Sequence, residues 1–274
     1  MTSNTTVTII TGASEGIGAE LARQLATRYG AGLSLVLAAR KREALDAVAD
    51  ICRAKGSQVL VVPTDVSVEA QCRALIQATI DAFGRIDTLV NNAGVSAQAL
   101  FQDVDAQDLH WYEDLMRVNL WGSVWCTHAA LPHIKQAQGR IVAVSSLAGL
   151  IGVPGRTAYS ASKFAMTGFF EALRAELKPS GVSVTTAFPG VVLTDIRAHG
   201  LNAKGEVAGS SGLKEDKAMT VSECAYLIAT GMQKRQREVV MTAQGKLGRF
   251  LKLLLPGVVE NMAMAALKDE VKPK

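Results

Sequence analysis

The chain has 274 residues, of which 49% are hydrophobic and 20% charged, with a formal net charge of +4. This composition is typical of a soluble globular protein that is long enough to bury a sizeable core. The basic residues are scattered, and their densest runs, at 40–42 and 234–237, are short and contain no aromatic residue. We therefore expect no nucleic-acid partner. The four cysteines stand far apart without C-x-x-C spacing, which indicates neither a disulfide framework nor a zinc site and fits a reducing compartment.

Seven short apolar runs rich in β-branched residues predict strands at residues 6–11, 33–38, 58–62, 86–90, 140–144, 182–188 and 238–241. Amphipathic stretches of helical period lie between them, among them 18–28, 42–54, 69–83, 105–131 and 157–177. Such alternation predicts the α/β class: a doubly wound, Rossmann-type, seven-stranded parallel sheet in three αβα layers, forming a single domain.

Two segments stand outside this alternation. The connection at about 190–219, rich in Gly, Ser and Lys, is expected to be a lid, a binding loop or a disordered segment. The apolar tail at 247–267 contains Pro256, which breaks or kinks a helix. We therefore expect a domain over 1–245 and a C-terminal helical extension over 246–274. Two interpretations of the extension remain: a helix pair packed on the domain or another subunit, or a peripheral membrane contact.

The N-terminal residues and the hydropathy of the chain indicate where the protein is expected to be located. The start, M-T-S-N-T-T, has no basic region followed by an apolar one, so no secretory signal is expected. No apolar run reaches the ~20 residues of a membrane span. The expected location is cytoplasmic, with membrane association only through the tail.

The first predicted strand is followed by T-G-A-S-E-G-I-G. In doubly wound folds this turn receives the pyrophosphate of a dinucleotide. Gly12, Gly16 and Gly18 would supply the tight turn, the close backbone approach and the helix packing, while N–H groups at the helix start face the phosphates. The spacing G-x-x-x-G-x-G differs from the G-x-G-x-x-G of other dinucleotide-binding enzymes.

Tyr159 and Lys163 lie four residues apart in Y-S-A-S-K, on one face of a predicted helix. An ammonium beside a phenol favours the phenolate and lowers the pKa of the tyrosine, so that it can transfer a proton near neutral pH. Alone, this spacing is common by chance on solvated helices.

Further motifs accompany this pair: Asp65-Val66, N-N-A-G at 91–94, Asn119, Ser145-Ser146 and P-G-V-V-L-T at 189–194. With the glycine turn and Y-S-A-S-K, and in this order, they resemble the short-chain dehydrogenase/reductase family. The tail and the residues after Lys163 are most similar to the branch of hydroxysteroid dehydrogenases and membrane-associated dehydrogenase/reductases. The resemblance implies metal-independent hydride transfer between a nicotinamide cofactor and a carbonyl or alcohol carbon.

The resemblance also assigns roles. Tyr159 is the acid/base, Lys163 lowers its pKa and holds the nicotinamide ribose, and Asn119 kinks its helix and holds a water in the proton relay. Ser146 hydrogen-bonds the substrate oxygen; Ser145 is its competitor, but the family spacing to the tyrosine favours Ser146. The expected cofactor-binding residues are Gly12, Ser14, Glu15, Gly16, Ile17, Gly18, Arg40, Asp65, Val66, Asn91, Ala93, Gly94, Tyr159, Lys163, Pro189, Gly190, Val192 and Thr194.

Cofactor choice depends on the end of the second strand. Ala39 stands where NAD-using members of the family have an acid, and Arg40 follows, so a 2′-phosphate would meet a cation. NADP(H) is therefore expected over NAD(H). One departure is Glu15, where many NADP-using relatives carry Lys or Arg.

The pocket residues implied by the resemblance, 147–155 and 191–193, are nearly all apolar. We therefore expect a lipophilic or neutral ketone or secondary alcohol as substrate. Arg156 and Arg197 are the nearest charged residues, and either would change this expectation if it faced the pocket. Alternatives are a 3-oxoacyl-type reductase acting on carrier-bound chains and a non-catalytic, nucleotide-sensing protein that keeps the fold.

Trp121 and Trp125 form an apolar ridge on the helix after Asn119, which in this family often packs at a subunit interface. A homodimer or homotetramer is expected, with ordinary core packing as the alternative. The histidines have no metal-ligand spacing, so no metal site is expected and they are interpreted as surface or capping residues: His110, His128, His133 and His199.

Overall fold

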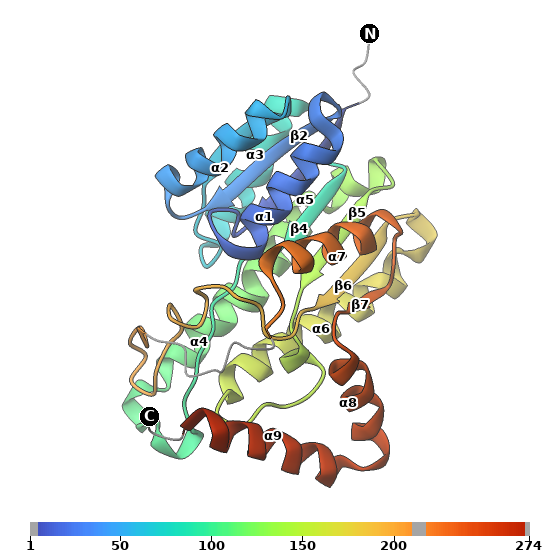
Figure 1. Cartoon of the computed structure of the whole chain (residues 1–274). Coiled ribbons are helices and arrows are strands. Elements are labelled where there is room, and N and C mark those ends of the chain that lie inside the picture. Colours follow the sequence, from blue (N-terminus) through green and yellow to red (C-terminus); the bar gives the residue numbers. More distant parts are fainter. Residues whose placement is uncertain (1–4, 210–217, 272–274) are drawn as a thin grey trace.

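One sheet organises the computed structural model, which describes residues 5–209 and 218–271. Within those residues, seven parallel strands lie in the order β3-β2-β1-β4-β5-β6-β7 (Figure 1). The strands are β1 (Thr6–Thr11), β2 (Leu33–Ala39), β3 (Gln58–Pro63), β4 (Thr88–Asn91), β5 (Arg140–Val144), β6 (Ser183–Phe188) and β7 (Glu238–Val240). The predicted doubly wound α/β fold is confirmed.

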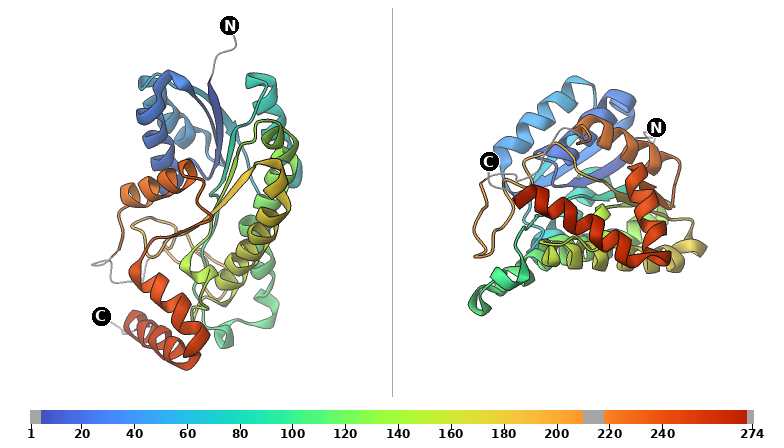
Figure 2. Two further views of the ribbon diagram at one scale, coloured as in Figure 1. Left: turned by 90° about the vertical axis from the view of Figure 1, so that its right-hand side faces the viewer. Right: turned by 60° about the horizontal axis from the view of Figure 1, so that its bottom comes forward.

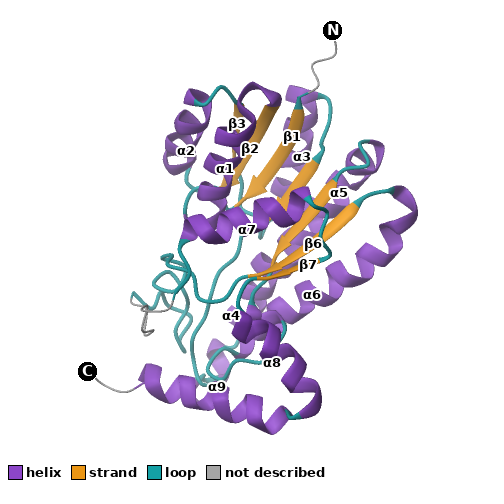
Figure 3. Ribbon diagram, turned by 45° about the vertical axis from the view of Figure 1, so that its right-hand side comes forward, coloured by secondary structure: helices purple, strands orange, loops and turns teal. Residues whose placement is uncertain are grey.

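Helices cover both faces of the sheet (Figures 2 and 3). One face carries α1 (Gly16–Tyr29), α2 (Arg42–Ala54) and α7 (Val221–Gln233), and the other carries α3 (Glu69–Phe83), α5 (Gly122–Gln136) and α6 (Thr157–Leu177). Successive strand residues point to opposite faces, so Ile10 joins the buried cluster under α1 and Ile9 the cluster under α5. These two apolar clusters hold the three layers together.

The order of the strands reverses at β1. The chain passes outward from β1 to β2 and β3, then returns to place β4 on the other side of β1. The loops that follow β1 and β4 therefore diverge at the carboxyl ends of neighbouring strands. A crevice at such a switch point is where doubly wound folds bind their ligands.

The long helix predicted at 105–131 is divided. The structure has α4 (His110–Met116), a π-helical segment over Arg117–Trp121, and then α5, which continues to Gln136. Pro132 does not end α5, although it lacks the N–H of an ordinary helical residue. Ile134, fully buried in the core beyond it, keeps the last turn packed.

Helix α7 has no counterpart among the predicted elements. Its start nevertheless has a sequence signal, because Thr220 and Glu223 have the T-x-x-E spacing of a capping box. The Thr220 hydroxyl accepts a hydrogen bond from the backbone N–H of Glu223 at 3.1 Å.

The C-terminal residues form α8 (Ala243–Leu254) and α9 (Pro256–Val271), on the side of the sheet where the strands end (Figure 1). Pro256 begins α9, the position where a proline is tolerated. The Lys252 ammonium donates to the carbonyl oxygen of Leu150 at 3.1 Å, which ties α8 to the segment after Ser146. Among the described residues, no helix has both the length and the apolar character needed to cross a membrane.

The connection predicted at 190–219 is irregular over its described part. Isolated bridges join Val192 to Met219 and Leu201 to Ala97 and Val207. The middle of this connection, 210–217, lies outside the described residues.

Candidate active site

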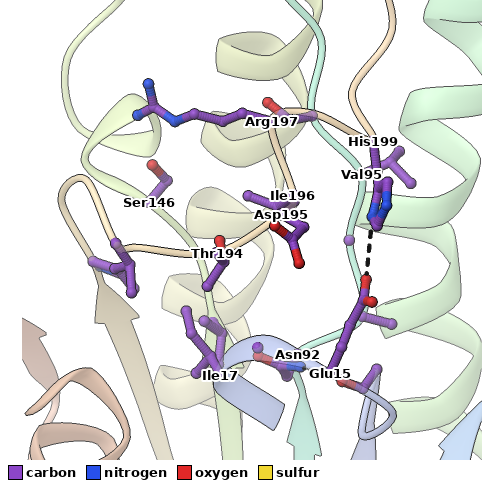
Figure 4. Close-up of a pocket in the computed structure, with 18 of the residues that line it drawn as sticks. Glu15, Ile17, Asn92, Val95, Ser146, Thr194, Asp195, Ile196, Arg197 and His199 are labelled. Atoms are coloured by element: carbon purple, nitrogen blue, oxygen red, sulfur yellow. Dashed lines mark hydrogen bonds and ion pairs between the residues drawn. The ribbon is translucent and has the colours of Figure 1, made fainter. Parts of the chain in front are cut away.

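A cleft of about 1260 Å³ opens at the carboxyl ends of the strands, between the turn after β1 and the loop after β6 (Figure 4). Most of the predicted site residues line it: Gly12, Ser14, Glu15, Gly16, Ile17, Arg40, Asp65, Val66, Ala93, Gly94, Ser146, Tyr159, Lys163, Pro189, Gly190, Val192 and Thr194. Three others, Gly18, Asn91 and Asn119, are buried and do not line it.

The turn after β1 depends on glycine for space. Gly12 has φ 65°, and a Cβ there would lie 2.8 Å from the Cα of Ala93 in the strand-end loop beside it. A side chain at Gly18 would collide with the carbonyl oxygen of Gly12, so Gly18 allows α1 to pack onto the turn. Glu15 precedes α1 without a side-chain cap, and the first amides of the helix form a site suited to an anion.

The loops after β1 and β4 are hydrogen-bonded to each other. The Thr11 hydroxyl accepts from the backbone N–H groups of Asn92 and Ala93, both at 3.0 Å. The Asn92 side-chain amide donates to the carbonyl oxygens of Thr11 at 2.9 Å and Gly12 at 3.1 Å. Asn92, which also lines the cleft, was not among the predicted residues although it lies within N-N-A-G.

Asn91 has a different position from the one expected. Its side chain is buried and donates to the Thr127 hydroxyl at 2.9 Å, behind the cleft. A direct cofactor contact from this side chain does not fit that position, because the side chain is buried and does not line the cleft. Its neighbour Asn92 points to the glycine turn instead. Asn91 thus joins β4 to α5.

Tyr159 and Ser146 both line the cleft, and the Ser146 hydroxyl acts on the pKa of the Tyr159 phenol. Burial raises the pKa of Tyr159, while the Ser146 hydrogen bond and the charges of Arg156 and Arg197 lower it, leaving the net pKa above its ordinary value. The charges that lower the pKa of the phenol here are those of the two arginines. That Lys163 lowers this pKa stays a prediction.

Lys163 is buried beside the tyrosine ring, with its Nζ 5.8 Å from the ring centroid. The ammonium donates to the carbonyl oxygen of Val144 at 3.0 Å instead of to the phenol. Burial lowers the pKa of Lys163 to about 8, because desolvation disfavours the charged form. The amine still carries its proton at neutral pH.

Asn119 lies at the centre of the π-helical segment and is fully buried. Its side chain exchanges two hydrogen bonds with the backbone of Val95, at 2.8 and 3.0 Å, and donates to the Ser162 hydroxyl at 2.9 Å. A Cβ at Gly94 would lie 3.1 Å from Asn119 Oδ1 and 3.5 Å from Lys163 Nζ. Asn119 therefore positions the loop that separates it from Lys163, and its predicted helix irregularity is present.

Ser145 differs from Ser146 in its contacts. It is buried, and its hydroxyl donates to the carbonyl oxygen of Lys163 at 3.3 Å and lies 3.2 Å from the Thr167 hydroxyl. Ser145 thus joins β5 to α6, which is the packing role expected for it. Ser146 lines the cleft, and its hydroxyl accepts a hydrogen bond from the backbone N–H of Ala148 at 3.2 Å.

Several cleft residues come from outside the motifs. Arg156 and Arg197 both line the cleft, so the pocket is not purely apolar. His199, interpreted from sequence as a surface or capping residue, also lines it and lies 3.4 Å from the Glu15 carboxylate (Figure 4). These residues sit in the irregular loop or at a helix start, where no local pattern reveals which way a side chain points.

The described residues contain no group of three or more His, Cys, Asp or Glu side chains arranged to hold a metal ion.

Comparisons with known proteins agree with this arrangement. The "11-beta-hydroxysteroid dehydrogenase-like 4A" of Arabidopsis thaliana is 47% identical over 69% of this chain, which spans 62% of that relative's length. The "11-beta-hydroxysteroid dehydrogenase 1A" of the same plant is 36% identical over 93% of this chain and 73% of that relative. The predicted resemblance to the hydroxysteroid dehydrogenase branch is confirmed.

Solved structures share the fold. A short chain dehydrogenase/reductase from Burkholderia phymatum, in complex with NAD, is 26% identical, covers 94% of this chain and 96% of that chain, and has a TM-score of 0.79. An alcohol dehydrogenase from the archaeon Thermococcus sibiricus, complexed with 5-hydroxy-NADP, is 23% identical over 86% and 94% of the two chains, with a TM-score of 0.72. The family model described as short chain dehydrogenase matches residues 6–204. The chain belongs to the short-chain dehydrogenase family.

Proposed function

We propose that this protein is an NADP(H)-dependent oxidoreductase that transfers hydride between the nicotinamide and the carbonyl or secondary alcohol carbon of a lipophilic substrate. The observation that carries the proposal is the meeting of Ser146, Tyr159 and Lys163 in one cleft at the switch point of the sheet. They lie on two elements, the end of β5 and helix α6, that Ser145 holds together.

The chemistry of the chain's own residues follows from this geometry. When a carbonyl is reduced, negative charge develops on its oxygen, and donors fixed at that point stabilise the charge without reorganising. The hydroxyls of Ser146 and Tyr159 are those donors, and Tyr159 gives the proton. The charged Lys163 amine, held by the Val144 carbonyl oxygen, keeps a positive charge near the phenol and holds the ribose in this proposal.

The residues present fit a nicotinamide dinucleotide. Gly12 lies so close to Ala93 that a side chain would obstruct the turn, and Glu15 leaves the first amides of α1 uncapped. The pyrophosphate would be held by this turn, the adenine end by Asp65 and Val66, and the nicotinamide end by residues 189–194. When bound, the cofactor supplies or accepts the hydride.

The preference for NADP(H) is supported by charge. Arg40 and Lys41 follow Ala39 at the end of β2, and all three line the cleft. A 2′-phosphate there would meet two cations and no acid on that strand end. Glu15 lies 3.4 Å from His199, at the turn after β1 and not at the end of β2.

The test is a screen of NADPH oxidation against ketones, including steroids, diketones and acyl thioesters, with Tyr159→Phe as the inactive control. Reduction of lipophilic ketones is expected. Activity only on acyl thioesters would favour the 3-oxoacyl-type reductase. NADPH binding without turnover of any carbonyl would favour the nucleotide-sensing alternative and contradict the proposal.

We also propose that the protein forms a homodimer or homotetramer through the surface around Trp121. The Trp121 side chain is 49% exposed although it stacks on Trp125, with 5.9 Å between ring centroids. Large exposed aromatic residues are common interface anchors. Light scattering at micromolar concentration is expected to give the mass of a dimer or tetramer, and monomer alone would contradict this.

The exposed apolar face of α8 supports a second contact, with a membrane surface. Leu247, Phe250 and Leu254 recur at helical spacing and are each more than half exposed, at 57%, 61% and 63%. An exposed apolar stripe of this kind is suited to the boundary of a lipid layer. The proposed location is therefore cytoplasmic, with peripheral membrane contact through the C-terminal extension.

A further inference from the structure

Two buried side chains connect helix α6 to the loop after β4, behind the wall of the cleft. Asn119, in the π-helical segment, and Ser162, on α6, are both fully buried, and neither lines the cleft. The Asn119 side-chain amide donates to the Ser162 hydroxyl at 2.9 Å, and that hydroxyl donates to the carbonyl oxygen of Tyr159 at 2.8 Å. The residues at the two ends of this chain of hydrogen bonds, Val95 and Tyr159, do line the cleft.

The direction of each hydrogen bond in this chain is fixed. A serine hydroxyl has one proton, and that of Ser162 goes to the Tyr159 carbonyl oxygen. Toward Asn119 the hydroxyl is therefore an acceptor, so it requires the NH₂ side of the carboxamide. Asn119 Oδ1 then accepts from the backbone N–H of Val95 at 2.8 Å, and the NH₂ group also donates to the Val95 carbonyl oxygen at 3.0 Å. A flipped carboxamide would set two donors against each other at Val95, so Ser162 and Val95 together specify one orientation of Asn119.

Tyr159 lies where a helix is weakest. It is the third residue of α6, in the first turn, whose N–H groups have no partner within the helix. Helix ends open more readily than helix centres. The Ser162 hydroxyl gives the Tyr159 carbonyl oxygen a hydrogen bond in addition to the helical one from the N–H of Lys163. Ser162 thus fastens the turn that carries the phenol.

Lys163 follows Ser162 in the chain but has anchors of its own. Its ammonium donates to the carbonyl oxygen of Val144 at 3.0 Å. Its carbonyl oxygen accepts from the hydroxyls of Ser145 at 3.3 Å and Thr167 at 2.8 Å. Loss of the Ser162 hydroxyl would leave these contacts in place and release the turn of the tyrosine.

We propose that Ser162 is a positioning residue for the reaction, which holds the first turn of α6, and with it Tyr159, against Asn119 and the loop after β4. This rests on the proposed function, in which Tyr159 gives the proton. A proton donor acts at a defined distance from the reacting oxygen. The link therefore contributes to the reaction without touching substrate or cofactor.

Amide hydrogen exchange reads both ends of the link without turnover. In Ser162→Ala, the Asn119 amide loses a buried acceptor and the Tyr159 carbonyl oxygen loses a donor. We expect the amides of Val95 and Lys163, followed one by one by NMR, to exchange about 2- to 10-fold faster than in wild type, the range for losing one hydrogen bond.

The matched control is Thr79→Val, on α3. The Thr79 hydroxyl is likewise fully buried and donates to a carbonyl oxygen of its own helix, that of Leu75, at 2.8 Å, and Thr79 does not line the cleft. This variant should leave kcat and the exchange of Val95 and Lys163 unchanged. The amide of Val36, in the buried strand β2, reports general stability. If Ser162→Ala speeds Val36 as much as Val95 and Lys163, its role is stability alone and the proposal is wrong.

The kinetic test uses a ketone that the wild type reduces. Ser162→Ala is expected to lower kcat by on the order of 10-fold, less than the ~10²-fold that a displacement of about 1 Å costs. The Kd for NADP⁺ should stay within about twofold of wild type, because Lys163 keeps its anchors. A wild-type kcat in the variant, or a loss confined to the Kd for NADP⁺, overturns the proposal.

The exchange rates also separate this proposal from the proposed function. If the wild type reduces no ketone, the proposed reaction fails by itself, and exchange at Val95 and Lys163 alone decides whether Ser162 holds this turn. Unchanged exchange at both amides overturns the inference and leaves the proposed reaction untouched. Should Ser162→Ala not fold, Ser162→Cys takes its place with the same expected results, since a thiol has a similar shape but is a weak donor and acceptor.

Discussion

The Lys163 ammonium donates a hydrogen bond of 3.0 Å to the carbonyl oxygen of Val144, the last residue of β5. This contact fixes the amine of α6 against the strand that leads to Ser146. It satisfies one of three ammonium donors in a buried setting, where the charge is costly. Burial accordingly lowers the pKa of Lys163 to about 8.

The first prediction concerns stability against pH. Below about pH 8 both the folded and the unfolded chain bind the proton, so the full cost of burying the charge is present. Between about 8 and 10.5 only the unfolded chain keeps it, so the free energy of unfolding rises with pH, by at most ~1.4 kcal/mol per unit from this group. Urea unfolding of wild type and Lys163→Met should diverge across this window. A difference that stays constant with pH would contradict the assignment.

The second prediction is that Tyr159→Phe removes nearly all turnover. Proton transfer by a positioned acid typically contributes ~10² to 10⁴-fold, so kcat should fall by about that factor. NADPH binding, followed by fluorescence titration, should be unchanged within about twofold, since the ring remains. A variant that keeps a tenth of its kcat would show that another group donates the proton.

The third prediction separates the two neighbouring serines. Ser146→Ala removes a hydroxyl donor at the reacting oxygen and should lower kcat by on the order of 10²-fold. It also removes the hydrogen bond that the Ser146 hydroxyl accepts from the Ala148 N–H at 3.2 Å, which should lower the free energy of unfolding by about 0.5 to 1.5 kcal/mol. Ser145→Ala removes the contacts to the Lys163 carbonyl and Thr167, and should lower the free energy of unfolding by about 1 to 2 kcal/mol. Both kcat and the free energy of unfolding are measured for each of the two variants. The reverse pattern would make Ser145 the substrate-binding serine.

The parts of this protein that were predictable from sequence are those with local periodicity. The strand β1 and the helix α2 were expected at or within a residue of their observed bounds, since alternation and helical spacing are local properties. The π-helical segment at Asn119 was expected only as a kink, because its geometry depends on the partners Val95 and Ser162. Secondary-structure period alone does not encode such tertiary contacts.

The same limit applies to the cleft. Glu15 and His199 lie far apart in the sequence, yet their side chains approach to 3.4 Å. No pattern in either segment predicts this contact. The hydrogen-bond partner of the Lys163 amine was not among the predictions. Helical spacing correctly places the amine beside Tyr159, but the buried carbonyl oxygen of Val144 competes for its hydrogen bond.

The fourth prediction concerns the cofactor. Ala39→Asp places a carboxylate at the end of β2, beside Arg40 in the cleft, where it would repel a 2′-phosphate and accept from a ribose hydroxyl. We expect the ratio of kcat/KM for NADPH over NADH to exceed one in wild type and to fall by at least about tenfold in the variant. Arg42→Ala, an exposed residue outside the cleft, is the control and should keep the wild-type ratio. A wild-type enzyme that prefers NADH contradicts the assignment of Arg40.

The last prediction tests the C-terminal extension. Phe250 and Leu253 on α8 are 61% and 79% exposed, and burying such side chains in lipid is worth about 1.5–3 kcal/mol each. Wild type is expected to sediment with vesicles of phosphatidylcholine and phosphatidylserine. The double variant Phe250→Glu, Leu253→Glu should lose this binding by tenfold or more and keep its NADPH oxidation. The matched control is Ile51→Glu, which changes an exposed apolar residue on α2. This helix covers a face of the sheet and lies far from the extension in sequence. The control variant should still sediment with the vesicles. If the control loses binding to the same extent, the effect is general charge repulsion from the anionic lipid and α8 is not the contact.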